Sequence, residues 1–111
     1  MAAPKASVVM TTVPDEATAE HIARTLVDEG LAACVQRTPI RSTYTWQGRV
    51  EDAVEVLLLV KTLAASYAAV ERRIVELSPY DVPEIIALDA ARIAPAYAAW
   101  LAAACRRGER H

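Results

Sequence analysis

The sequence predicts an α+β domain in which a long β-hairpin is the central element. The stretch 44–62, YTWQGRVEDAVEVLLLVKT, begins with aromatic and β-branched residues and has its tip at Gln47-Gly48-Arg49. From Val56 to Val60 every residue is apolar. Successive side chains of a strand face opposite ways, so both faces of this arm must be covered. A chain of 111 residues has few helices for the second face, which suggests that another copy of the chain covers it.

The first elements are a strand and a helix. The run SVVMTT at 7–12 is short, apolar and β-branched, which is typical of a strand. Pro14, Asp15 and Glu16 then open a helix, with Asp15 as an alternative N-cap. Apolar residues recur at helical spacing through Val27, and Gly30 suits the left-handed residue that ends a helix.

The chain from 31 to 46 is predicted to be extended and to lead into the hairpin. Pro39 cannot donate to a β-ladder, so it indicates an edge strand or a bulge. Beyond it, alternate residues share one face of the strand: Ile40, Ser42, Tyr44 and Trp46.

A second helix, a short strand and a last helix follow. Tyr67, Val70, Ile74 and Leu77 fall on one helical face, and the stretch 83–89, PEIIALD, is typical of a strand. Pro95 opens the last helix, whose predicted apolar stripe is Tyr97, Trp100, Leu101 and Ala104, and Gly108 ends it.

The order strand, helix, strand, strand, helix, strand is the split βαβ pattern of a ferredoxin-like domain, here with a C-terminal helix. We expect a single domain over 1–111, with flexible ends at 1–6 and 108–111.

Composition excludes several classes of function. The net charge of −2 gives no electrostatic case for nucleic acid or an anionic membrane surface, and no apolar run approaches the length of a membrane span. Cys34 and Cys105 form neither a CxxC motif nor a disulfide framework, which favours a reduced, cytoplasmic protein.

Few residues suggest a chemical site. Lys61 follows the apolar run at the end of the second arm. Its ammonium group either extends to solvent at the rim of the sheet or lies in a cleft, paired with a carboxylate such as Glu84. Tyr80 and Glu84 lie in a stretch that Pro79 and Pro83 stiffen, and rigid loops often carry sites. Cys34 is either a small buried residue or a metal ligand. No catalytic constellation is evident.

Four stretches resemble one known family. VVMTTVPDEATAEHIARTLVDEGLAACV (8–35), TYTWQGRVEDAVEVLLLVKT (43–62), PYDVPEIIAL (79–88) and, more loosely, AYAAWL (96–101) resemble the CutA family of divalent-cation-tolerance proteins. The resemblance implies a ferredoxin-like subunit in a homotrimer, with Trp46 and Tyr44 at the subunit contact. It also implies a link to copper and other divalent cations, and no established reaction. We expect the interface to include Val56 and Leu58, and folding to need no metal.

The same resemblance carries cleft positions over to Thr11, Cys34, Lys61, Tyr80 and Glu84. Many relatives have histidine where this chain has Ser78, which removes a possible metal ligand.

Four functions stay open. The first is a metal-responsive trimer that binds copper or a small ligand, with Cys34 as the candidate ligand. The second is a sensor like the PII signalling proteins, binding an anionic effector between subunits through Lys61. The third is an enzyme that uses Lys61, Tyr80 and Glu84. The fourth is a scaffold whose only role is to form the trimer.

Overall fold

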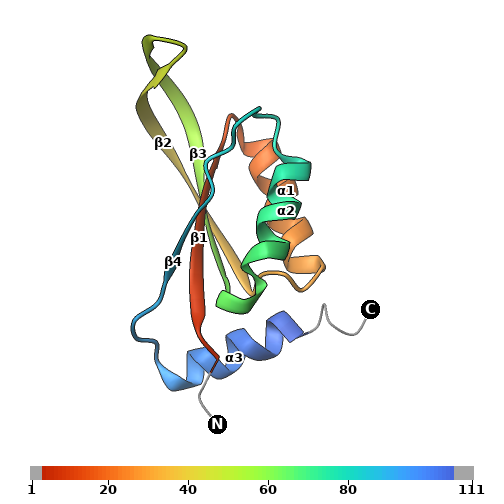
Figure 1. The fold of residues 1–111 in the computed structure, drawn as a ribbon. Helices are drawn as coiled ribbons and strands as arrows, with labels where there is room; N and C mark the ends of the chain where they lie inside the picture. Colours follow the sequence, from red (N-terminus) through yellow and green to blue (C-terminus); the bar gives the residue numbers. More distant parts are fainter. Residues whose placement is uncertain (1–3, 107–111) are drawn as a thin grey trace.

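The computed structural model describes residues 4–106 and confirms the predicted α+β, ferredoxin-like order (Figure 1). A short 3₁₀ turn at Ala64–Ser66 precedes the second helix. The strands and α-helices in this range are β1 (Ala6–Val13), α1 (Glu16–Asp28), β2 (Cys34–Trp46), β3 (Arg49–Leu63), α2 (Tyr67–Leu77), β4 (Ile86–Asp89) and α3 (Pro95–Arg106).

The four strands form one sheet in the order β2-β3-β1-β4, with every neighbouring pair antiparallel. Strand β1 lies in the interior and pairs with β3 on one side and with the short β4 on the other. Strand β2 is an edge strand, which explains how it accommodates Pro39. None of the helices within 4–106 is long and apolar enough to cross a membrane.

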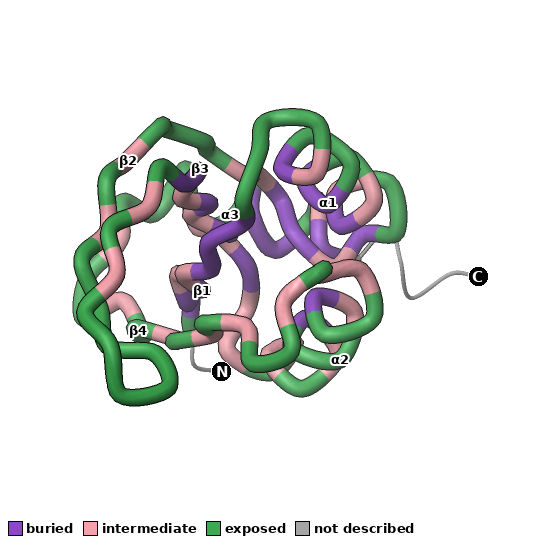
Figure 2. The backbone as a smooth tube through the Cα atoms, turned by 90° about the horizontal axis from the view of Figure 1, so that it is seen from above, coloured by how far each residue is buried: buried purple, intermediate pink, exposed green. Residues whose placement is uncertain are grey.

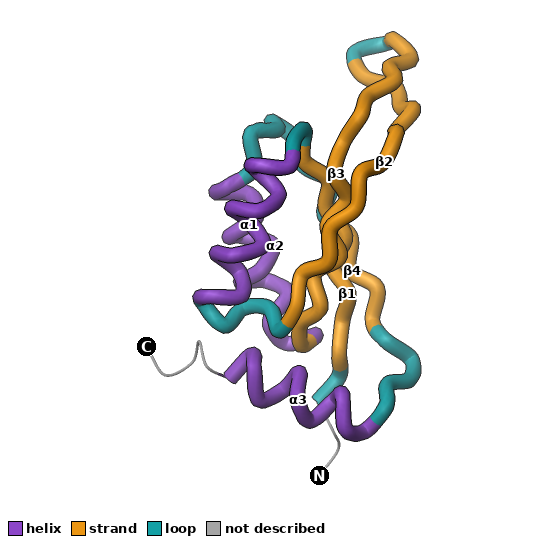
Figure 3. The backbone as a smooth tube through the Cα atoms, turned by 180° about the vertical axis from the view of Figure 1, so that it is seen from behind, coloured by secondary structure: helices purple, strands orange, loops and turns teal. Residues whose placement is uncertain are grey.

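Helices α1 and α2 cover one face of the sheet (Figures 1 and 3). Asp15 is the N-cap of α1: its Oδ1 accepts a hydrogen bond from the Thr18 amide at 2.8 Å, and this backbone hydrogen bond lowers the pKa of Asp15. Gly30 follows the helix at φ 72°, as predicted. The buried core between helices and sheet comprises Val9, Val13, Ala19, Ile22, Ala23, Leu26, Ala32, Val56, Leu58, Val60, Val70 and Ile74.

The β2–β3 hairpin projects beyond the rest of the fold (Figures 1 and 3). Trp46 pairs with Arg49, so the turn has two residues, Gln47 at φ 51° and Gly48 at φ 77°. Positive φ at both positions is the type I′ geometry that matches the twist of a tight hairpin. The hairpin gives the subunit its elongated dimensions of 50 × 29 × 21 Å.

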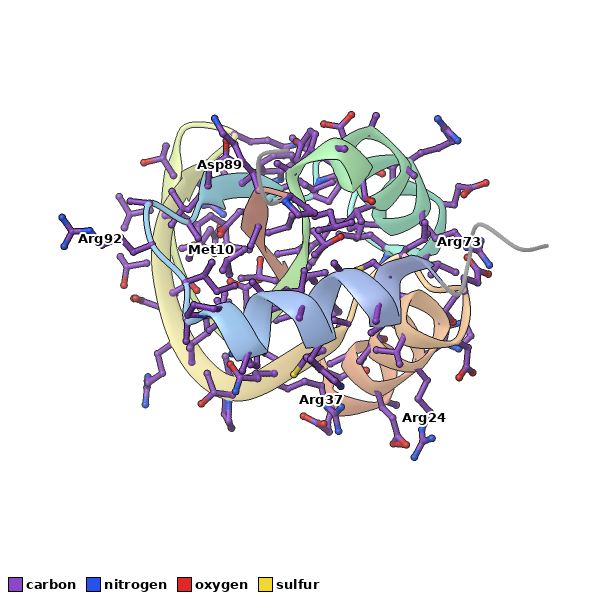
Figure 4. All side chains as sticks on the ribbon, turned by 90° about the horizontal axis from the view of Figure 1, so that it is seen from below. Met10, Arg24, Arg37, Arg73, Asp89 and Arg92 are labelled. Carbon is purple, nitrogen blue, oxygen red and sulfur yellow. The ribbon has the colours of Figure 1, made fainter. Side chains whose placement is uncertain are left out.

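The other face of the sheet is only partly covered (Figure 2). Helix α3 packs across one end, where Ala6, Ala33, Leu101 and Cys105 form a second buried cluster. Beyond that end the face stays open. Leu57 and Leu59 are half-buried, while Ile86 and Leu88 are 50% and 56% exposed. Figure 4 shows Met10 of β1 on this side of the sheet, away from α1 and α2.

This arrangement corrects the predicted subunit contact. Val56 and Leu58 are 6% and 0% exposed and lie in the core beneath α1 and α2, so they are not surface residues. The reason is that successive side chains of a strand point to opposite faces of the sheet. Val56 and Leu58 therefore share a face with Val60, whereas Leu57 and Leu59 point to the open side. The uncovered apolar surface of β3 is therefore made by the odd-numbered leucines.

Other expected boundaries also shift. The flexible start was expected to reach residue 6, but Ala6 is buried in β1 and the Lys5 carbonyl accepts a hydrogen bond from the Ala64 amide. Strand β4 begins at Ile86 rather than at residue 83. In α3, Leu101 is buried but Tyr97 and Trp100 are exposed, and their rings contact each other in a tilted arrangement with their centres 5.3 Å apart. Residues 1–3, 107 and the predicted end at 108–111 lie outside the described residues.

Candidate functional site

The main pocket lies between the projecting hairpin and the loop that precedes β4, and has a volume of about 740 Å³. This is within the usual range of small-molecule sites. The hairpin contributes Ser42, Thr43, Tyr44, Trp46 and Glu55, and β1 contributes Thr12. The loop contributes Pro79, Tyr80, Asp81, Val82 and Glu84.

A hydrogen bond between Tyr80 and Glu55 joins the two walls of the pocket. The Tyr80 hydroxyl donates to Glu55 Oε2 at 2.7 Å. The Tyr80 amide donates to Ser78 Oγ at 3.2 Å, which helps to hold the loop in place. Burial, and then the hydrogen bond to Glu55 and its negative charge, raise the pKa of Tyr80 above its ordinary value of 10.0.

The pocket is acidic and aromatic. Its charged lining residues are three carboxylates, Glu55, Asp81 and Glu84, and the described lining includes no lysine, arginine or histidine. Tyr44, Trp46 and Tyr80 supply aromatic surface. Glu55 is only 7% exposed, which is unusual for a carboxylate without a cation beside it.

The structure divides the predicted cleft residues into separate groups. Tyr80 and Glu84 line the pocket, as do Tyr44 and Trp46, which were expected at a subunit contact. Lys61 shares the open face with Glu55 but lies six residues further along β3, about 20 Å away at strand spacing. The pairing with Glu84 is therefore wrong for the single subunit: within residues 4–106 Lys61 forms no ion pair.

Lys61 belongs to a second, smaller constellation beside α3. Its Nζ lies 5.8 Å from the centre of the Tyr97 ring, and its neighbour on β2 is Cys34. The Cys34 side chain is half-buried. An acid–base trio of Lys61, Tyr80 and Glu84 does not form within one subunit, because the lysine lies at the opposite end of the face.

Thr11 is not a cleft residue. It is fully buried on the helix-covered face, opposite Leu58, and its Oγ1 has no hydrogen-bond partner. The described residues also contain no group of three or more Cys, His, Asp or Glu side chains that could hold a metal ion. Cys34 therefore lacks companion ligands within this part of the single chain.

Glu55 is the site residue that sequence reasoning did not select. The signal was present: a single acid, between Val54 and Val56, leads into an uninterrupted apolar run. A charged residue at the start of such a run indicates either a solvent-facing position or a buried charge with a purpose. Only the position of the 79–84 loop decides between the two.

Comparison with known proteins agrees with this architecture. A family model described as "CutA1 divalent ion tolerance protein" matches residues 7–104. The chain belongs to the CutA1 family. The "Divalent-cation tolerance protein CutA" of Thermus thermophilus is 47% identical over 95 residues, which cover 85% of this chain and 92% of that relative.

Solved CutA structures share the whole fold. The crystal structure of CutA from Xylella fastidiosa superposes with a TM-score of 0.88 at 40% identity, covering 90% of this chain and 97% of that one. CutA1 from Oryza sativa gives a TM-score of 0.89 at 35% identity, covering 92% and 94% of the two chains. The resemblance to the CutA family is thus confirmed. The family model and the Thermus thermophilus relative are named for divalent-cation tolerance and not as enzymes.

Thr11→Val should stabilise the protein. Valine has nearly the shape of threonine and removes a buried hydroxyl that has no partner, so the free energy of unfolding should rise by about 1 kcal/mol. Denaturant unfolding measures the change, with Thr62→Val as control because the Thr62 hydroxyl does donate to the Leu31 carbonyl at 2.7 Å. Equal effects of the two substitutions would contradict the conclusion that the buried Thr11 hydroxyl has no hydrogen-bond partner.

Tyr80 should make the protein sensitive to alkali. Its pKa is raised in the folded state, so the folded state holds the phenolic proton more tightly than the unfolded state does. This stabilising contribution is complete below the ordinary pKa of 10.0 and is lost as pH rises towards the folded-state value. Above pH 10, unfolding free energy should fall more steeply in wild type than in Tyr80→Phe. Parallel curves from urea unfolding at pH 9–11.5 would contradict this.

Proposed function

We propose that this chain acts in divalent-cation tolerance as a homotrimer whose subunits cover one another's open sheet face. The observation that carries the proposal is the apolar surface of β3 and β4 that α3 leaves uncovered: Leu57, Leu59, Ile86 and Leu88. Met10 of the intervening strand β1 pairs with both Leu59 and Ile86, so it joins the two parts of this surface. Partly exposed apolar surface of this kind is typical of a protein–protein interface.

The hairpin supports self-association in a second way. Tyr44 and Trp46 are 43% and 44% exposed although both are large aromatics on the open face. The outer edge of β2, 13 residues long, has no strand partner within the described chain. A closed assembly would pair or cover such edges, which otherwise favour aggregation.

The proposed ligand of the trimer is copper or another divalent cation. Because the described part of one subunit holds no three-ligand group, the proposed metal site takes ligands from more than one copy, with Cys34 as its thiolate. A thiolate is a soft ligand that suits copper. The proposed compartment is the cytoplasm, where the thiol stays reduced. The metal has no proposed part in folding, since the core is apolar.

A second candidate is a PII-like sensor of a small anion, favoured by Lys61. This cation has no carboxylate partner within residues 4–106 and lies beside Tyr97. If Lys61 binds an anionic effector, a panel of phosphates and dicarboxylates should raise the melting temperature of wild type but not of Lys61→Ala. A panel without effect, or equal effects on both proteins, would remove this candidate.

The trimer is tested by an added charge. Wild type should sediment at about three times the 12.0 kDa chain mass. Leu59→Asp should dissociate it, because the carboxylate would be buried in an apolar contact at a cost of several kcal/mol. Val75→Asp, on the exposed surface of α2, is the matched control and should stay trimeric. A monomeric wild type, or a trimeric Leu59→Asp, would contradict the proposal.

Metal binding is tested by calorimetric titration of tag-free protein with copper. Saturable binding at micromolar metal should be lost in Cys34→Ala and kept in His21→Gln, which removes an exposed imidazole on α1. Binding that is unchanged in Cys34→Ala excludes Cys34 as ligand, and no saturable binding excludes direct copper binding while leaving the trimer unaffected.

A further inference from the structure

We propose that Cys34 and Lys61 form a redox-sensitive modification site, in which a peroxide joins the Cys34 sulfur to the Lys61 nitrogen through a reversible sulfenamide bond. The inference comes from the placement of two nucleophilic side chains side by side at the α3 end of the open face. The link takes up the thiol that the proposed copper site uses, so its consequence for metal binding rests on the proposed function.

The register of the sheet brings the two side chains together. Cys34 of β2 and Lys61 of β3 are direct partners in the antiparallel pair. Directly opposite residues point to the same face, with their Cβ atoms about 4.5–5.5 Å apart. The lysine side chain is long enough to fold back over this separation. The link therefore needs only rotation about the side-chain bonds of Lys61, because the backbone already pairs the two residues.

The surroundings keep the amine at this end of the face. The Lys61 Nζ lies 5.8 Å from the centre of the Tyr97 ring, which belongs to α3. Helix α3 packs across the same end of the sheet. Within residues 4–106 Lys61 forms no ion pair, so no carboxylate there competes with the sulfur for its amine.

Exposure selects Cys34 over Cys105 as the thiol that reacts. Cys34 is half-buried, whereas Cys105 is 3% exposed and lies in the buried cluster beneath α3. Oxidation of a thiol by peroxide is favoured by exposure to solvent and by a positive charge beside the sulfur. Lys61 supplies that charge at Cys34. We therefore expect a peroxide to oxidise Cys34 first.

The chemistry needs one equivalent of hydrogen peroxide. The Cys34 thiol gives up two electrons to the peroxide, whose O–O bond breaks, and the products are a sulfenic acid and water. The unprotonated amine of Lys61 then attacks the sulfur: the S–N bond forms, the S–O bond breaks and a second water leaves. Sulfenic acids condense with nitrogen nucleophiles in this way. Two equivalents of a thiol reductant restore both side chains and become one disulfide.

The experiment treats tag-free protein with hydrogen peroxide, blocks the remaining thiols and digests the chain with trypsin. We expect the peptide 25–37 to be joined to the peptide 50–72, with the mass of both less two hydrogens. Trypsin should no longer cleave after Lys61, because its nitrogen carries the sulfur. Dithiothreitol should separate the pair. The denatured protein should keep the 12.0 kDa mass of one chain, since the link lies within a subunit.

Three variants make the test specific. Cys34→Ser and Lys61→Arg should each abolish the joined peptides, and Lys61→Arg keeps the positive charge while it removes the amine. It also decides the result if Cys34→Ser does not fold. Cys105→Ala is the matched control and should form the link as wild type does. Lys5, the only other lysine of the chain, is exposed and should stay unmodified in every sample.

Three results would overturn the proposal: no joined peptides after peroxide treatment, joined peptides that persist in Lys61→Arg, or a disulfide as the only product of Cys34. Linked protein should also lose saturable copper binding and regain it once the bond is reduced and the reductant removed. Copper binding that survives in linked protein would overturn this consequence. Because the link is measured without copper, a protein that forms it but binds no copper would contradict the proposed metal site alone.

Discussion

Strand β3 has to be buried on both faces, and most of the structure depends on how this is achieved. Its even-numbered residues, Val56, Leu58 and Val60, pack beneath α1 and α2. Its odd-numbered residues Leu57 and Leu59 face the other way, where α3 reaches only one end. One subunit therefore completes one core and leaves a second apolar face only partly covered.

The alternation of side chains along β3 also places two charged residues on its open face. Glu55 and Lys61 bracket the open apolar stretch of β3, with the acid at the hairpin end and the cation at the α3 end. The acidic pocket and the lysine thus belong to two separate places on one face. In an assembly that covers this face, both would border the contact between subunits, so ligand binding and association would be coupled there.

The sequence predicts the elements well because local signals are strong. Asp15, Gly30 and Gly48 each indicate an element boundary, and the structure places a boundary at each: Asp15 is the N-cap, which was the alternative prediction, and the turn is Gln47-Gly48 without Arg49. The side of the sheet on which each residue of β3 lies was harder to predict. A continuous apolar run has no period, so nothing in it shows that Leu58 rather than Leu59 lies beneath the helices. Once the pairing of β3 with β1 is known, the same register separates Thr11, opposite Leu58, from Lys61.

The pocket could be predicted only in part. Tyr80 and Glu84 were selected because prolines stiffen their loop, and both line the pocket. Glu55 was missed because its burial depends on a loop more than 20 residues later in the chain. Burial that is created by distant chain segments leaves no local pattern. For the same reason β4 starts late: its pairing with β1 covers only residues 86–89, whatever the strand propensity of residues 83–85.

The interior position of β1 has a consequence for biosynthesis. Its main partner, β3, begins only at Arg49, and its other partner, β4, at Ile86. At synthesis rates of about 5–20 residues per second, the first strand waits a few seconds without a partner. During that interval the segment ASVVMTTV is uncharged, β-branched and free of proline, the composition that favours aggregation. Strand β1 is therefore synthesised before either of its partners and is protected only when the hairpin has been made.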